Sequence, residues 1–200
     1  MAASETVVGN AALIKLGVAT VVTFADESKA ARLLTQRFAA LRDLEMRMHP
    51  WTAFTTRAAL TAEAVTPAFG YAYQYVLPAD CLRLTRVGDY DAVLGLIDYD
   101  GGGRALYALE DGRILTDLGA PLHIRYVKRV TDTTRWDPCF EEALACRIAM
   151  DLGEPLTQSD TKIARAAALY KEAIKEARRQ NAIERPAESI PDGPWVMGRL

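Results

Sequence analysis

The sequence has few of the residues that usually carry catalysis or bind metals. Its 200 residues include three cysteines and two histidines. Neither His49 nor His123 has a cysteine, histidine or carboxylate at ligand spacing, so no metal site is expected. There is no Gly-x-Ser-x-Gly elbow, and Gly101 to Gly103 lead into a strand-like segment with no Gly-Lys-Ser/Thr after them. We therefore expect no enzymatic activity and no cofactor.

Long apolar runs and paired cysteines are absent as well. No run approaches the roughly 18 apolar residues of a membrane span, and no basic region precedes an apolar block near residue 1. Cys81, Cys139 and Cys146 are odd in number, and a shared helix would hold the last two roughly 10 Å apart, too far to bridge. These features predict a protein made in a reducing cytoplasm, with no signal peptide and no membrane partner.

Neither sign of charge dominates the whole chain, which carries 24 basic and 26 acidic side chains for a net charge of −2. That balance lacks the basic footprint of a duplex-binding protein. Local segments differ more strongly, because residues 160–185 carry seven cations against four anions. Residues 89–111 carry one cation, Arg104, and six carboxylates: Asp89, Asp91, Asp98, Asp100, Glu110 and Asp111. Asp98, Asp100 and Asp111 could imitate a catalytic carboxylate pair, but a Gly-rich loop favours simple solvation.

Apolar periodicity predicts four helices, two near the start of the chain and two near its end. We expect them at residues 4–17, 28–49, 138–152 and 159–184. Ser4 and Ser28 are suitable N-caps, and Gly17 is a suitable C-cap. Pro138 suits a first helical position, and Gly153 with Pro155 predicts the end of the third helix.

Residues 53–130 have the patterns of short antiparallel strands. Tyr71, Tyr73 and Tyr75 alternate, so their rings should share one strand face. Asp111-Gly112 predicts a two-residue hairpin turn. No connection is long enough for a helical crossover, so we expect an antiparallel meander packed with the helices. The prediction is an α+β fold with a single domain over residues 1–184 and an extended arm, containing three prolines, over residues 185–200.

The helical and β layers meet at residues 42–57. Pro50 cannot continue a helix and pushes His49 out of helical geometry, so the second helix must end there. Trp51 is large enough to pack against both layers.

Charged and aromatic residues away from the core give candidate contact sites. Arg37 and Glu45 project onto the apolar stripe of the second helix, where they either reach solvent along their stems or meet partners on a neighbouring chain. Arg178 and Arg179 on the last helix are weaker candidates for such contacts, with a solvated face as the simpler interpretation. In the arm, an apolar set either docks on a partner or folds back: Ile190, Trp195, Val196 and Met197.

Several segments together resemble the tail tubular protein A family, the head-to-tail adaptors of tailed bacteriophages. They are residues 10–17 (NAALIKLG), 24–31 (FADESKAA), 42–51 (RDLEMRMHPW) with Arg57 beyond, and 69–83 (FGYAYQYVLPADCLR). The most specific pieces are His49-Pro50-Trp51 and the run from Tyr75 to Arg83. The resemblance covers about the first 90 residues; the last two helices match in pattern only. Residues 52–54 (TAF) depart from the family's Asn-Phe-Ala.

This resemblance implies a virion protein at the head-to-tail junction, made in the host cytoplasm. It would form a ring of twelve copies between the portal protein and the tail nozzle or tube, with double-stranded DNA passing through non-specifically. Asp98, Asp100 and Asp111 would then line the channel and repel phosphate. Ile190, Trp195, Val196 and Met197 would dock on the portal.

Two other functions fit parts of the sequence. One is a small soluble α+β ligand-binding or enzymatic domain with Tyr71, Tyr73 and Tyr75 as a pocket wall. The other is a DNA-binding helix-turn-helix made by the first two helices, although about ten residues between Gly17 and Ser28 are too many for that turn.

Overall fold

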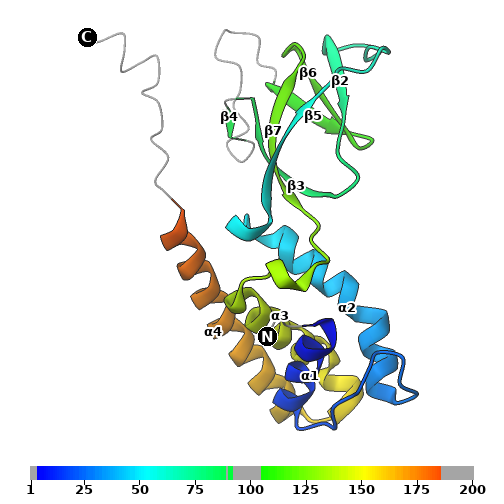
Figure 1. Cartoon of the computed structure of the whole chain (residues 1–200), viewed down its shortest axis with the longest axis vertical. Helices are drawn as coiled ribbons and strands as arrows, with labels where there is room; N and C mark the ends of the chain where they lie inside the picture. The colour runs from blue at the N-terminus through cyan, green and yellow to red at the C-terminus, as the bar shows by residue number, and fades with distance from the viewer. Residues whose placement is uncertain (1–3, 89, 92–104, 186–200) are drawn as a thin grey trace.

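The chain folds into four helices and two antiparallel sheets, which confirms the predicted α+β class (Figure 1). The computed structural model describes residues 4–88, 90–91 and 105–185. The helices are α1 (Glu5–Leu16), α2 (Lys29–Met48), α3 (Pro138–Thr157) and α4 (Asp160–Glu184), with short 3-10 turns η1 (Thr52–Phe54) and η2 (Thr133–Arg135). The strands are β1 (Thr55–Leu60), β2 (Tyr73–Val76), β3 (Cys81–Val87), β4 (Tyr90–Asp91), β5 (Tyr107–Glu110), β6 (Arg113–Thr116) and β7 (Leu122–Lys128).

Local capping chemistry sets most helix ends. The Ser4 hydroxyl accepts the Val7 N–H, and Gly17 ends α1 in the left-handed region at φ 64°. The Ser28 side chain caps α2, which ends at Met48 with His49 in extended geometry before Pro50. The predicted bounds of α1, α2 and α4 are confirmed to within one residue.

The predicted end of the third helix is wrong. α3 continues through Gly153 and Pro155 and ends at Thr157, five residues beyond the expected stop. Gly153 is buried where α3 meets α4, and a Cβ there would lie 3.2 Å from the Ile163 side chain. Close packing therefore outweighs the low helix propensity of Gly153, and the helix carries Pro155 within its last turn.

The β region contains two sheets among the described residues, and not the single meander that we expected. Their strand orders are β1-β7-β3-β4 and β2-β6-β5, antiparallel throughout. The Asp111-Gly112 turn is confirmed, with φ of 46° and 70°. The division follows from packing, because Tyr75 and Ile114 of one sheet share a buried cluster with Ile124 of the other.

The two cores occupy the two ends of the molecule. One lies among the helices and includes Phe38, Trp51 and Phe140; the other lies between the sheets. In Figure 1 the helices fill one end and the strands the other, with α2 and α4 both leading toward the sheets.

Candidate interaction surfaces

Trp51 joins the helical layer to the sheet layer, as the sequence predicted. It is 3% exposed and belongs to the same core as Leu82 and Val127 of the first sheet. Its indole N–H donates to the Glu45 carbonyl at 3.1 Å, and its ring packs edge-on against Phe140 of α3, with centroids 5.5 Å apart. The His-Pro-Trp segment therefore fixes how the two layers meet.

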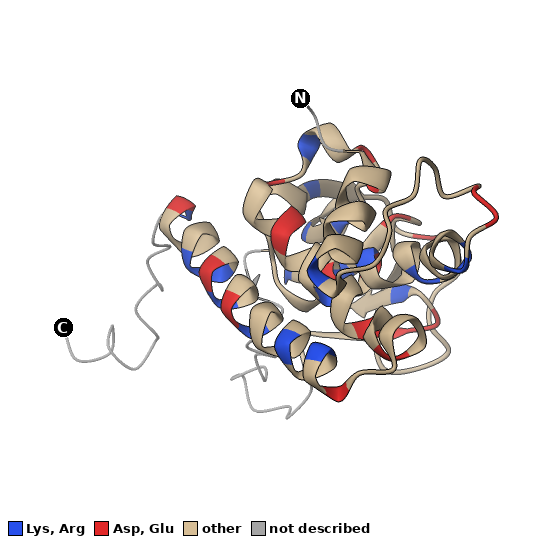
Figure 2. Cartoon of the chain, turned by 90° about the horizontal axis from the view of Figure 1, so that it is seen from below, with Lys and Arg blue, Asp and Glu red and all other residues tan. Residues whose placement is uncertain are grey.

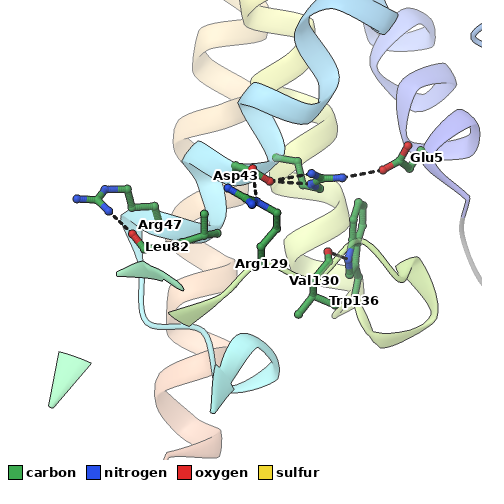
Figure 3. A network of polar contacts seen from close by, with 8 residues as sticks. Glu5, Asp43, Arg47, Leu82, Arg129, Val130 and Trp136 are labelled. Atoms are coloured by element: carbon green, nitrogen blue, oxygen red, sulfur yellow. Dashed lines mark hydrogen bonds and ion pairs between the residues drawn. The ribbon is translucent and has the colours of Figure 1, made fainter. Parts of the chain in front are cut away.

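A polar network centred on Arg42 connects the helical layer to the sheet layer at a second place (Figure 3). The guanidinium of Arg42 is buried and pairs with Asp43 at 2.8 Å and with Glu5 of α1 at 2.9 Å. Asp43 also accepts from Arg129, just beyond β7, at 2.7 Å. Arg47 donates to the Leu82 carbonyl of β3. Residues of the segment 42–51, which carries the family resemblance, thus connect α1, α2 and the first sheet.

The end of α4 is attached to the joint through Asn181. Its side-chain oxygen accepts the Thr52 backbone N–H at 2.7 Å, and its amide nitrogen lies 2.9 Å from His49 Nε2. Burial, followed by the positive charges of Arg178, Arg185 and Arg83, lowers the pKa of His49 to about 4. His49 is therefore a neutral hydrogen-bonding group at physiological pH, with no ligand role required.

The position of Glu45 contradicts both predictions made for it from the sequence. Its side chain is fully buried, so it neither reaches solvent nor meets a neighbouring chain. It accepts from the Tyr170 hydroxyl of α4 at 3.0 Å, and Arg147 lies over the Tyr170 ring. Burial raises the pKa of the Glu45 carboxyl, while Tyr170 and the charges of Arg147 and Arg178 oppose the rise. Glu45 ties α2 to α4 within one copy.

Arg37 finds its partner inside the chain as well. Its guanidinium makes two bonds to Asp151 of α3, at 2.8 and 2.9 Å, on the molecular surface. Arg178 and Arg179 are exposed on α4, with Arg179 3.5 Å from Glu176. Figure 2 shows acidic and basic residues mixed along this helix. The described part of α4 is therefore a mixed-charge face, available to a neighbouring copy without being strongly basic.

The acidic segment and the arm lie mostly beyond the described ranges. Asp98, Asp100, Ile190, Trp195, Val196 and Met197 all fall outside the described residues. Asp111 is described: it lies at the β5–β6 turn, its side chain is 93% exposed, and it pairs with Arg113 at 2.7 Å.

The three alternating tyrosines do not form one strand face, because Tyr71 precedes β2 and only Tyr75 belongs to the core. Tyr75 is fully buried and its hydroxyl donates to the Leu118 carbonyl, while Tyr73 lies at the exposed margin of the same face. His123 lies on β7, as expected of a sheet residue. Within the described residues, no group of three or more potential ligands is placed to hold a metal ion.

The sequence analysis missed a row of arginines on the first sheet. Arg57 on β1, Arg125 on β7 and Arg86 on β3 are direct cross-strand partners, beside an open hollow of about 410 Å³. The only sequence signal was the alternation of these residues with apolar ones. Their alignment depends on strand order, which alternation alone does not give.

Comparison with known proteins adds no family assignment to this geometry. None of the helices in the described ranges is both long and apolar enough to span a bilayer. No protein-family model matches the chain, and no curated protein matches it either.

Proposed function

We propose that this chain is a head-to-tail adaptor of a tailed bacteriophage, forming a ring between the portal and the tail nozzle or tube. The observation that carries the proposal is the segment 42–51, whose resemblance to the tail tubular protein A family coincides with its position at the joint between the layers. A ring component needs separate surfaces for its neighbours in the ring and for its partners above and below. The helical end and the sheet end provide such surfaces.

In this proposal twelve copies close around a passage for double-stranded DNA, and the role is structural. Asp98, Asp100 and Asp111 face the passage and keep it negative, so that DNA slides without being held. Ile190, Trp195, Val196 and Met197 of the arm contact the portal.

Electron microscopy of the purified chain, alone and mixed with its cognate portal, tests the proposal. We expect rings on the portal, with or without rings of the chain alone, since a template can be needed for closure. A chain that remains monomeric with the portal present contradicts the proposal.

The lumen assignment has its own test. Changing Asp98, Asp100 and Asp111 together to Asn should slow DNA ejection from assembled particles while leaving the rings intact, because the channel would lose its repulsion of phosphate. Ejection at the wild-type rate would remove these residues from the lumen.

The alternative of a ligand-binding or enzymatic domain is less well supported. That alternative places Tyr71, Tyr73 and Tyr75 in a pocket wall, but Tyr75 is buried in the core between the sheets. Gel filtration separates the two functions, since a small-molecule enzyme of this kind would be a compact monomer whether or not portal is present.

A further inference from the structure

One side of α4 carries basic and no acidic side chains over residues 171–185. Residues seven apart lie on nearly the same side of a helix, because seven residues make about two turns. Lys171, Arg178 and Arg185 have this spacing, and Lys175 lies one turn beyond Lys171. All four are exposed, and none lies within ion-pair distance of a carboxylate in the described part of the chain. We call these four residues the basic flank of α4.

The basic flank lies on the side of α4 that faces α2. Burial lowers the pKa of His49 at the end of α2 to about 4, and the charges of Arg178 and Arg185 add to this shift. Burial raises the pKa of Glu45, and Arg178 is one of the groups that oppose the rise. Glu45 bonds to Tyr170 and not to Arg178. The flank therefore keeps its positive charge next to α2.

The opposite side of α4 is acidic. A rotation of about 100° per residue places Glu176 and Glu184 within about 40° of the side opposite the first residue of the basic flank. Both lie near the start of α3, because burial raises the pKa of Cys139 and the charges of Asp137, Glu176 and Glu184 raise it further. Burial and the charge of Asp137 also raise the pKa of Glu141. We call three of these carboxylates the acidic flank: Glu141, Glu176 and Glu184.

Interactions within the chain neutralise little of the acidic flank. Glu184 accepts the hydroxyl of Thr52, which carries no charge, at 3.0 Å. Glu176 accepts the neutral amide of Gln180 at 2.7 Å and lies 3.5 Å from Arg179. That ion pair is exposed to solvent, where such pairs contribute little. The acidic flank therefore remains open to a cationic partner.

The sorting of charge on α4 does not stabilise the helix itself. Like charges four residues apart repel along a helix, whereas opposite charges at that spacing attract. Lys175 lies four residues from both Lys171 and Arg179, and Glu172 lies four residues from Glu176. Glu172 and Arg179 lie between the two flanks, on the outward side of the helix. A pattern that is unfavourable within the helix and separates the two signs indicates contacts on both sides of it.

We propose that the basic flank of one copy binds the acidic flank of the next copy in the ring. Opposite charges on the two sides of one helix give a head-to-tail contact that repeats around a closed ring. In Figure 2 the last turns of α4 extend beyond the other helices, so neighbouring copies can reach both sides. The inference rests on the proposed function, because the ring supplies the neighbouring copy. Duplex DNA is the competing partner, but the acidic flank of the same helix and the net charge of −2 favour another copy of the chain.

Charge reversal tests this contact. The variants K171E/K175E/R178E and E141K/E176K/E184K are each mixed with portal, and rings are counted by electron microscopy. Each variant alone should lose ring yield at least about tenfold, because like charges then meet across the contact. An equimolar mixture should recover rings, since alternating copies restore opposite charges at every contact.

A matched control and a milder variant accompany the reversals. R32E/R135E/R165E reverses three exposed arginines outside both flanks and should assemble as the wild type does. Thermal melting checks that every variant is folded. K171A/K175A serves where a reversal lowers the melting temperature, because alanine favours the helix. It should lose ring yield several-fold, and wild-type yield from it would overturn the inference.

The remaining outcomes separate this contact from the proposed function. Full assembly of either folded triple variant would overturn the inference and leave the proposed function standing. Loss of rings in both variants without recovery in the mixture would show that the two flanks do not meet. Lost salt-dependent DNA binding with unchanged ring yield would overturn the inference in favour of a nucleic-acid surface. Failure of wild-type protein to form rings on the portal would overturn the proposed function, and this contact with it.

Discussion

Glu45 shows how much one side chain depends on its tertiary surroundings. Its carboxylate is enclosed between α2 and α4, with one oxygen bonded to Tyr170 and the other, Oε1, without a hydrogen-bond partner. A buried charge with incomplete hydrogen bonding costs more free energy than a neutral amide in the same place. Its raised pKa means that stability is lost as the pH rises above the ordinary value of 4.5.

Replacing this carboxylate should therefore stabilise the fold at alkaline pH. We expect E45Q to raise the free energy of unfolding by about 1 kcal/mol at pH 8, with the gain vanishing near pH 4, where both states of the wild type hold the proton. Chemical denaturation at the two pH values measures the difference. E172Q, at an exposed position of α4, should change neither value. Equal stability of E45Q and wild type at pH 8 would show that the buried charge is fully compensated.

His49 should make the fold sensitive to acid. Its pKa is about 4 in the folded protein and ordinarily 6.5. Between these values the unfolded chain takes up a proton that the folded chain refuses, so stability falls as the pH falls through this window, and above pH 6.5 there is no effect. Since the ring is only half-buried, we discount the loss to about 1–2 kcal/mol.

The H49Q variant tests this assignment, because it cannot titrate. Its free energy of unfolding should change less than that of the wild type between pH 6.5 and 4. H123Q, which changes an exposed histidine on β7, is measured beside it as the control for the substitution itself. A wild-type slope in H49Q would assign the acid sensitivity to other groups.

At the scale of elements, helix caps are where the sequence is most informative. Asp137 accepts the N–H groups of Cys139 and Phe140 at 2.8 and 3.2 Å, whereas Ser159 at the start of α4 makes no capping bond with its side chain. Such bonds depend on residues within four positions of each other, so the sequence predicts them directly. The end of α3 depends instead on Ile163, ten residues beyond Gly153, and was missed for that reason.

The two caps make a matched pair for mutation. D137A should lower the free energy of unfolding by about 1 kcal/mol, because two backbone N–H groups lose their acceptor. S159A should have an effect of only a few tenths of a kcal/mol, within the usual range for a side chain that makes no special contact. Thermal or denaturant unfolding of the two variants gives both numbers. Equal losses would show that the capping bonds of Asp137 contribute nothing beyond helix propensity.

At the scale of the whole molecule, two cores hold the described residues together. The buried residues of both cores lie between Val8 and Ala177. A chain that ends at Arg185 should therefore keep the melting temperature of the full chain to within a few degrees.

The same truncation should abolish stable joining to the portal, because it removes Ile190, Trp195, Val196 and Met197. Co-sedimentation with portal measures this loss. W195A should weaken the association at least tenfold, as expected for an aromatic anchor, while R199A serves as a control on the same arm. Normal joining by the truncated chain would contradict the docking role.

The sequence by itself determined the helix starts, the stop at Pro50, the Asp111-Gly112 turn and the α+β class, because each depends on local backbone preferences or on periodicity. Only the tertiary structure decided that the strands form two sheets, that Glu45 is buried beside Tyr170, and that Arg57, Arg86 and Arg125 form one row. Those features depend on which strands pair and on which helices pack together, and residues far apart in the chain settle both through the free energy of burying shared apolar surface.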